Sequence, residues 1–227
     1  MKQTVFGILA VIILGISCKK DAPPTPAPVA DRYLNSNNAS SWNYELVNNI
    51  TVTTSLYTLT STNRDSTISS KPYHVFTNSG TTGNEYYNIT GNEYYNFRSL
   101  PAAFGGSNVE VLYLKDNVAV GGTWFQAFSV TASGFPAVVT LANTIAEKGI
   151  TKVINGVTYN DVIKVSTNIT ATISNIPLPA GALTTDIQTF YAPKYGLIQS
   201  INKIDVNFSG IMDHTDQQTN LKSSDLK

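Results

Sequence analysis

The chain has 227 residues, enough for one large domain or two small ones. Its 15 basic and 15 acidic side chains cancel, which argues against a nucleic-acid binder, because such a protein needs a basic surplus to neutralise phosphates. One cysteine and two histidines exclude an intramolecular disulfide and a cysteine zinc site and make a multi-histidine metal centre improbable, so we expect no metal and no cofactor.

Residues 1–17 have the form of an export signal peptide. Lys2 supplies a positive charge, and residues 5–14 form an apolar run that is too short to cross a bilayer as a helix. The run ends in Gly15-Ile16-Ser17-Cys18, with small residues one and three places before the cysteine. This pattern resembles the lipobox of bacterial lipoproteins, which implies cleavage after Ser17 and lipidation of Cys18. The alternative is an ordinary signal peptide with an incidental cysteine.

The residues after the cysteine bear on the membrane. Cys18-Lys19-Lys20-Asp21 resembles the start of many Bacteroidota lipoproteins. No aspartate follows Cys18 directly, so the familiar signal for inner-membrane retention is absent, and the resemblance implies an outer-membrane lipoprotein. Only Asp21 is acidic in this window, which leaves open whether the protein faces the periplasm or the exterior.

Residues 18–41 read as a tether behind the lipidated cysteine. Prolines 23, 24, 26 and 28 favour an extended polyproline II segment of about 3.1 Å per residue, and an Asn- and Ser-rich run follows. We expect this segment to hold a domain away from the membrane. A ligand for a proline-recognition domain is the alternative, supported by composition alone.

The body, residues 42–212, alternates with a period of two. Threonine (27 residues) favours strands, and asparagine (22) and serine (20) favour turns. Alternating apolar positions predict strands around residues 42–46, 111–115, 158–166 and 204–208. Residues 140–148 are the one helix candidate, and we favour a strand there because β-branched residues precede it. The body therefore predicts nine to eleven strands in one all-β domain.

Turn residues separate these runs. Asn155-Gly156 is a strong two-residue hairpin signal, and reversals are also expected at residues 63–65, 105–106, 121–122 and 179–181. The expected fold is an antiparallel meander that forms a curled sheet, a half-barrel or a sandwich, with little or no helix. Residues 213–227 are polar, and we expect a fraying tail.

An internal repeat, Gly-Asn-Glu-Tyr-Tyr-Asn, occurs at residues 83–88 and 91–96. If residues 90 and 91 form a two-residue turn, Tyr87 faces Tyr94 and Tyr86 faces Tyr95, one pair on each face. These pairs either stabilise a hairpin or form a platform on which sugar rings stack, since tyrosine offers an apolar face and a hydroxyl.

Three segments resemble a group of small all-β bacterial lipoproteins of unknown function. They are residues 155–165 (NGVTYNDVIKV), residues 191–198 (YAPKYGLI) and Gly122-Thr123-Trp124. The resemblance implies an antiparallel, lipid-anchored domain and transfers no catalytic residues.

Motifs for catalysis are weak. The sequence contains no G-x-S-x-G, no Walker loop, no G-x-G-x-x-G and no H-E-x-x-H. Ser200 and Lys203 match S-x-x-K, but a strand places residues three apart on opposite faces. His74 reads as an isolated strand residue, and His214, beside Asp213 and Asp216, as part of a solvated polar run rather than a weak cation site. We therefore expect no enzymatic activity.

A modification site is one further candidate. Asp65-Ser66-Thr67 resembles the acceptor sequence for protein O-glycosylation in Bacteroidota, with Ser66 as the modified residue. It falls in an expected turn, which suits a modified site.

The sequence therefore predicts a lipid-anchored cell-envelope lipoprotein that presents a non-enzymatic β domain for binding or for a structural role. Its partners would be the membrane, through Cys18, and a glycan or an envelope protein. Two alternatives remain: a surface glycan-binding or adhesion module built on the tyrosine hairpin, and a periplasmic carrier that holds an apolar ligand in a curved sheet.

Overall fold

The computed structural model describes every residue except 1–31, 82, 101–105, 107, 133, 209 and 210. The expected signal peptide, Cys18 and the proline run therefore lie outside the described residues. The described part contains thirteen strands and no helix. The strands are β1 (Ser41–Asn48), β2 (Thr53–Ile68), β3 (Lys71–Asn78), β4 (Asn84–Thr90), β5 (Glu93–Ser99), β6 (Asn108–Lys115), β7 (Thr123–Ala132), β8 (Phe135–Ile154), β9 (Val157–Ile173), β10 (Ile176–Pro177), β11 (Leu183–Ala192), β12 (Gly196–Phe208) and β13 (Ile211–Asp225).

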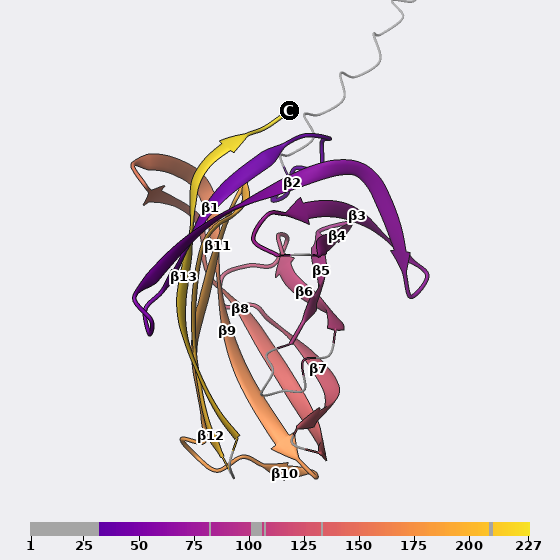
Figure 1. Cartoon of the computed structure of the whole chain (residues 1–227), viewed down its shortest axis with the longest axis vertical. Helices are drawn as coiled ribbons and strands as arrows, with labels where there is room; N and C mark the ends of the chain where they lie inside the picture. The colour runs from indigo at the N-terminus through magenta and orange to yellow at the C-terminus, as the bar shows by residue number, and fades with distance from the viewer. Residues whose placement is uncertain (1–31, 82, 101–105, 107, 133, 209–210) are drawn as a thin grey trace, which may run out of the picture. The chain divides into compact units, whose positions relative to one another are not determined.

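All of these strands belong to one antiparallel sheet (Figure 1). Twelve follow a single path in the order β6-β5-β4-β3-β2-β1-β13-β12-β11-β9-β8-β7, and β10 pairs with β9 beside the path. Most strands that are neighbours in sequence are neighbours in the sheet; the exceptions are β6 and β7, at the two ends of the path, and β10 and β11. The last strand, β13, pairs with the first, β1. The predicted all-β meander is confirmed, and its curled form is a nearly closed, barrel-like sheet.

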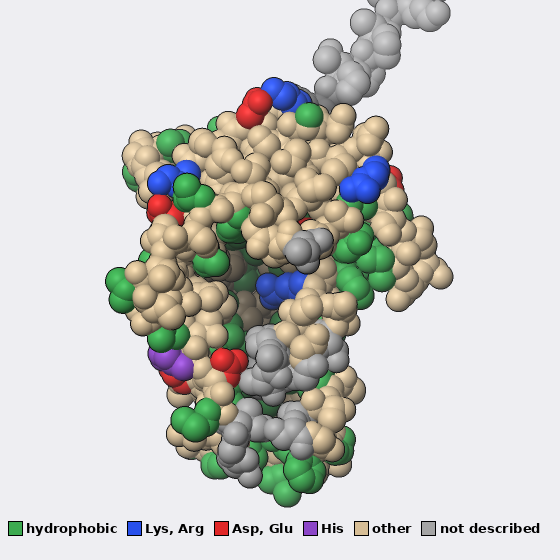
Figure 2. Space-filling view, viewed as in Figure 1, with side chains coloured by type: hydrophobic (Ala, Val, Ile, Leu, Met, Phe, Trp, Pro, Cys, Tyr) green, Lys and Arg blue, Asp and Glu red, His purple; other side chains and the backbone are tan. Residues whose placement is uncertain are grey.

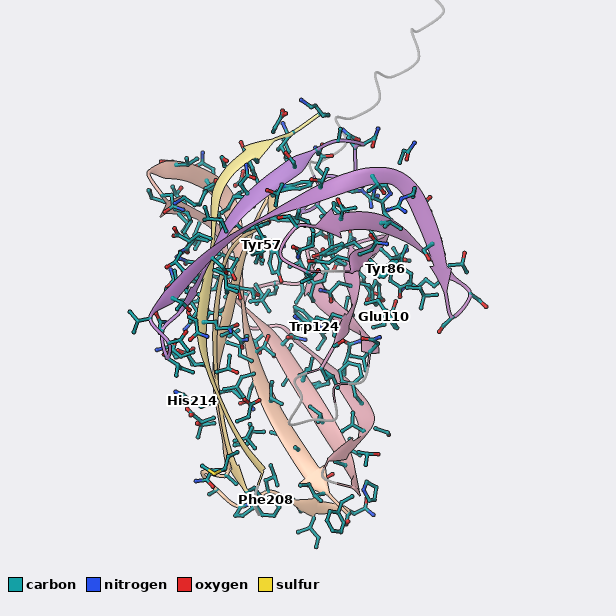
Figure 3. All side chains as sticks on the ribbon, viewed as in Figure 1. Tyr57, Tyr86, Glu110, Trp124, Phe208 and His214 are labelled. Atoms are coloured by element: carbon teal, nitrogen blue, oxygen red, sulfur yellow. The ribbon has the colours of Figure 1, made fainter. Side chains whose placement is uncertain are left out.

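The two end strands of the path, β6 and β7, meet through side chains instead of a backbone ladder. The Trp124 indole nitrogen donates to the Leu112 carbonyl at 2.9 Å, and the Leu112 amide donates to Oε1 of Gln126 at 2.6 Å. Gln126 Nε2 also donates to the Glu110 carbonyl at 3.4 Å. We call this contact between β6 and β7 the seam; Figure 3 shows Trp124 in it.

Strict alternation along β8 explains why residues 140–148 form a strand and not a helix. Ala137, Val139, Leu141, Asn143 and Ile145 are all buried, while the residues between them are less buried. A period of two places these five side chains on the inner face of the sheet, whereas a helix would scatter them. The strand expected at 140–148 is therefore confirmed.

Two turn predictions have opposite outcomes. Asn155 and Gly156 both have positive φ angles, 50° and 80°, and Ile154 pairs with Val157 across them, so this hairpin is confirmed. The reversal expected at residues 63–65 is wrong, because these residues continue β2 through an irregularity in its pairing with β3. The chain reverses later, at Ser69 and Ser70, which also have positive φ angles.

The expected boundary between tether and domain at residue 41 is too late. The described residues from Arg32 onward belong to one compact unit with the sheet. The Arg32 carbonyl accepts from the Lys194 amide at 2.7 Å, and the Tyr33 amide donates to the Tyr94 hydroxyl at 3.2 Å. Ser40 is fully buried. The segment before β1 is thus packed against the sheet.

The expected fraying tail is also wrong, because most of it forms β13 between β1 and β12. The inward positions of β13 before Leu221 are Asp213, Thr215, Gln217 and Thr219. Polar residues there remove the apolar alternation that identifies a strand in a sequence. No helix in the described part of the chain is long and apolar enough to cross a membrane.

Candidate functional site

The sheet encloses a cavity of about 620 Å³. A volume of this size falls in the range of small-molecule sites. The molecule is hollowed on the face shown in Figure 2, where a basic side chain stands in the hollow. The lining residues lie on the inner face of the barrel-like sheet, on strands of opposite walls, and are joined by Leu34 of the segment before β1.

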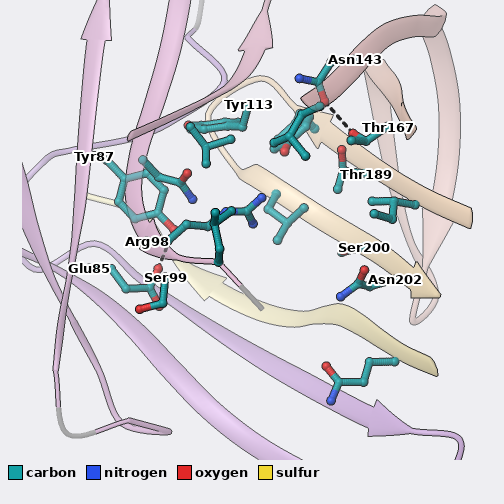
Figure 4. A pocket seen from close by; sticks show the side chains of 18 of the residues that line it. Glu85, Tyr87, Arg98, Ser99, Tyr113, Asn143, Thr167, Thr189, Ser200 and Asn202 are labelled. Carbon is teal, nitrogen blue, oxygen red and sulfur yellow. Dashed lines mark hydrogen bonds between the residues drawn. The ribbon is translucent and has the colours of Figure 1, made fainter. Parts of the chain in front are cut away.

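One wall of the cavity carries a row of polar side chains. Asn143 of β8 pairs with Thr167 of β9, and Asn202 of β12 pairs with Gln217 of β13. Ile187 of β11 pairs with both Thr167 and Asn202, so it links the two pairs at the same level. Thr189 and Ser200, themselves paired, lie one step along the same faces. We call Asn143, Thr167, Thr189, Ser200, Asn202 and Gln217 the polar row (Figure 4).

The opposite wall is aromatic and charged. Tyr87 of β4 and Tyr113 of β6 line it together with Glu85 and Arg98 (Figure 4). The Tyr87 hydroxyl donates to Glu85 Oε2 at 2.6 Å, and Asn78 Nδ2 donates to Glu85 Oε1, so both carboxylate oxygens are occupied.

Several polar groups on the lining have no hydrogen-bond partner in the described part of the protein. The side chains of Arg98, Tyr113, Ser200, Asn202, Asp213, Thr215 and Gln217 are in this position. Two lining amides also have a buried atom without a partner, Oδ1 of Asn96 and Nδ2 of Asn143. Buried polar groups in native proteins are almost always paired, and the other seven side chains keep accessible surface, so this concentration of unpaired groups marks a space for water or a polar ligand.

Exposure differs between parts of the cavity lining. Val139, Leu141 and Ile204 retain at most 4% of their surface, because they pack into the core below the cavity. The polar row, apart from Asn143, and the tyrosines Tyr57, Tyr87 and Tyr113 are only half-buried. The cavity therefore presents hydroxyls, amides and tyrosine rings together with the aliphatic side chains of Leu34, Ile187 and Leu197, which are also half-buried.

Burial keeps the cavity tyrosines in their protonated form. It raises the pKa of Tyr44, Tyr87 and Tyr113 well above the ordinary value. The negative charge of Glu85 raises the pKa of Tyr87 further. These hydroxyls therefore act as neutral donors and acceptors at physiological pH.

The four tyrosines of the repeat do not form one platform. Gly91 and Asn92 make the turn, so Ile89 pairs with Tyr94 and Asn88 with Tyr95. The expected direct pairs, Tyr87 with Tyr94 and Tyr86 with Tyr95, are wrong, because the turn lies one residue later than expected. That shift still leaves Tyr87 and Tyr94 on the inner face and Tyr86 and Tyr95 on the outer face.

Their environments differ as well. Tyr94 has no exposed surface and donates to Asp116 at 2.7 Å, so it has no free face for a sugar. Tyr87 lines the cavity. Tyr95 lies under the Lys71 ammonium, which is 3.3 Å from the ring centroid, and donates to Glu93. Tyr86 is half-buried beside them (Figure 3).

His74 is less isolated than the sequence predicts. Its Nε2 lies 2.9 Å from Ser61 Oγ, and its Nδ1 lies 3.0 Å from Asp65 Oδ1. Ser61, His74 and Asp65 are therefore connected by hydrogen bonds in the order serine, histidine, aspartate of a catalytic triad. However, Ser61 is 1% exposed and its hydroxyl donates to the Ser36 carbonyl at 3.0 Å. The serine hydroxyl is thus closed off from solvent and held by the Ser36 carbonyl, and these hydrogen bonds fasten the irregular part of β2 to the N-terminal segment.

The remaining candidate residues from the sequence lie on opposite faces of their strands. His214 contacts Asp205 on β12, on the outer face (Figure 3), while Asp213 turns to the cavity. No cluster of three metal-ligating side chains occurs among the described residues. Ser200 lines the cavity, whereas Lys203 pairs with Asp216 at 3.4 Å, so the two point to opposite faces as the strand pattern predicts.

Ser66 lies in β2, paired with Tyr73, and is half-buried. The turn expected around it is absent. Sequence reasoning considered a carrier with an apolar ligand in a curved sheet but missed the polar lining of the cavity. Its signal is present: polar residues occur at inward positions of otherwise apolar strands, as at Ser200 and Asn202 between Ile198 and Ile204.

No known protein family matches this sequence, and no curated protein shows significant similarity to it. The fold is similar to the crystal structure of a candidate lipoprotein of Parabacteroides distasonis, with 11% identity, a TM-score of 0.54, and coverage of 87% of this chain and 100% of that chain. A candidate exported protein with a YmcC-like fold from Bacteroides fragilis gives 8% identity, a TM-score of 0.49 and the same coverage. The chain thus shares its antiparallel β fold with the Parabacteroides protein.

Proposed function

We propose that the protein is a lipoprotein anchored to the outer membrane through Cys18, and that its β domain is a non-enzymatic module that binds a small ligand inside the sheet. The lipobox-like sequence before Cys18 supports the anchor. The fold shared with a candidate lipoprotein is consistent with it. The burial of Ser61, whose hydroxyl is held by the Ser36 carbonyl, supports a role without catalysis.

The cavity carries the proposal for binding. Its volume of about 620 Å³, its access from one face and its unpaired polar groups are what a site for a small molecule requires. A sheet with a purely structural role has no need to keep Ser200, Asn202 and Gln217 at inward positions without partners. The mixed lining favours a polar ligand over the apolar ligand considered from the sequence.

Native mass spectrometry tests the binding role. The protein purified from the cells that produce it should carry an additional mass that is released on denaturation. Thr189→Trp places an indole in the cavity and should abolish that mass. Thr184→Trp, on the exposed outer face of the same strand, is the matched control and should retain it. A bound mass retained in the Thr189→Trp variant would contradict binding in the cavity.

The anchor is tested separately. Cys18→Ser should move the protein from the detergent-soluble membrane fraction to the soluble fraction, because an acyl anchor contributes about 0.8 kcal/mol for each buried CH₂ group. Incorporation of a labelled fatty acid should disappear in the same variant. Labelling that persists without Cys18 would contradict the lipoprotein assignment.

Protease treatment of intact and lysed cells distinguishes the membrane faces. Digestion on intact cells places the domain outside and favours the surface alternative. Protection until lysis places it in the periplasm and favours a carrier.

A further inference from the structure

We infer that the cavity ligand is an uncharged saccharide, whose rings lie against the cavity tyrosines and whose hydroxyls bond to the polar row. This inference rests on the proposed binding function and names the chemistry of the ligand. It follows from three features of the lining: tyrosine faces, unpaired polar groups and the balance of charge.

The tyrosine faces are the first feature. Tyr87 and Tyr113 are half-buried and line the space opposite the polar row, and half-buried Tyr57 lines it from β2. The Tyr113 ring lies 5.3 Å from the Tyr191 ring, tilted by 33°, and meets Tyr87 at 6.2 Å with nearly perpendicular rings. These contacts fix the orientation of the Tyr113 ring. A fixed aromatic face suits the apolar face of a sugar ring, and the adjacent hydroxyl suits its polar edge.

The unpaired polar groups are the second feature. Asn202, Ser200 and Gln217 offer an amide, a hydroxyl and a second amide from two adjacent strands, and none has a hydrogen-bond partner in the described part of the chain. Each amide both donates and accepts, as does each sugar hydroxyl. An acyl chain or a flat apolar ligand would leave these groups desolvated and unpaired, which is unfavourable.

The charges are the third feature. Among the described residues, the lining holds one cation, Arg98, and two carboxylates, Glu85 and Asp213. Glu85 lies on the same wall of the cavity as Arg98, yet no ion pair joins them among the described residues. The donors of the Arg98 guanidinium are therefore free for a ligand. An acidic ligand would meet two like charges, whereas hydroxyls donate to carboxylates and accept from a guanidinium. The lining therefore fits an uncharged polyol better than an anion.

The test measures binding of defined probes to the full-length protein in detergent by native mass spectrometry. The probes are neutral oligosaccharides of two to four rings (maltose, cellobiose, chitobiose and mannobiose series), digalacturonate as an acidic sugar, and oleate as an apolar ligand. Material released from the native protein is analysed for sugars in parallel. We expect a neutral oligosaccharide to bind and the released material to contain sugar.

Two matched substitutions on β12 locate the site. Asn202→Leu should weaken binding of that oligosaccharide roughly tenfold, because an amide that pairs with ligand hydroxyls is replaced by an apolar group. Asn207→Leu, exposed on the outer face of the same strand, should leave the affinity unchanged. Thermal unfolding of both variants confirms that they fold.

The outcomes separate the two proposals. Binding of digalacturonate or oleate alone, or release of a lipid or peptide, would overturn the saccharide inference and leave cavity binding intact. Oligosaccharide binding that Asn202→Leu does not weaken would also overturn the inference. If no probe binds and no material is released from the native protein, both proposals fail.

Discussion

The inner face of the sheet has two levels along the same strands: a packed lower core, and above it the level of the cavity. The two levels differ in the side chains that they carry. Along β12, Val206 is buried in the lower core and Ile204 is buried at the floor of the cavity, whereas Ser200 and Asn202, only a few residues away, are half-buried and line the cavity. The backbone ladder is continuous through both levels, so the difference lies in the side chains alone. The lower core stabilises the fold, and the cavity level keeps polar groups available for a ligand.

The largest effect should come from alkaline pH, which acts on the cavity level through its tyrosines. Burial raises the pKa of Tyr44, Tyr87 and Tyr113, so the folded state holds these protons more tightly than the unfolded state. Their contribution to stability is complete below about pH 10, the pKa of unfolded tyrosine, and decreases as the pH rises further. We expect tyrosine ionisation, measured at 295 nm, to coincide with cooperative loss of circular dichroism above that pH. A smooth, non-cooperative titration centred on pH 10 would contradict this.

The next effect contrasts the two levels directly. Ile204→Ala, at the floor of the cavity where the side chain packs into the lower core, should lower the free energy of unfolding by about 3 kcal/mol, because it removes a 3% exposed side chain from a packed cluster. Asn202→Ala at the cavity level should lower it by less than about 1 kcal/mol, because no hydrogen bond in the described chain is lost. Urea unfolding measures both. Equal losses would show that the cavity level is packed like the core.

A smaller effect is expected at the seam. Gln126→Leu removes the side chain that bonds the Leu112 amide and the Glu110 carbonyl, so we expect a loss of about 2 kcal/mol and faster hydrogen exchange at Leu112. Gln188→Leu, on the outer face of β11, is the control and should change stability by less than about 0.5 kcal/mol. Unchanged exchange at Leu112 would show that β6 and β7 are held by other contacts.

The smallest effect concerns the hydrogen-bonded series of Ser61, His74 and Asp65. His74→Ala removes two side-chain hydrogen bonds that join β3 to β2 and should lower the free energy of unfolding, measured by thermal unfolding, by about 1 kcal/mol. If this hydrogen-bonded series is purely structural, neither the native protein nor the variant should react with a serine-directed fluorophosphonate. Labelling of Ser61 in the native protein would contradict the structural role.

The sequence predicts the strands wherever one face is apolar. Period-two alternation identifies β1, β6, β9 and β12, and Asn155-Gly156 identifies its hairpin, because the positive φ angles there need these residues. The same reasoning fails for β13, whose inward side chains Asp213, Thr215 and Gln217 face the cavity. It fails at residues 63–65 because polar, turn-forming residues also occur in an irregular, exposed part of a strand.

The site itself depends on pairings that a single sequence does not contain. Tyr87, Asn143 and Asn202 lie on three strands far apart in sequence, and only the closed order of the sheet brings them to one cavity. The tyrosine repeat drew attention to the correct hairpin, but the position of its turn decided which rings pair. Side-chain register is sensitive to a single residue in a turn.

The most direct test of the cavity as a binding site is a crystal structure of the protein purified from the cells that produce it. Binding in the cavity predicts continuous density of a bound molecule between Tyr113 and the polar row, within hydrogen-bond distance of Asn202. Isolated water molecules in an otherwise native cavity, or side chains that fill the space, would contradict it.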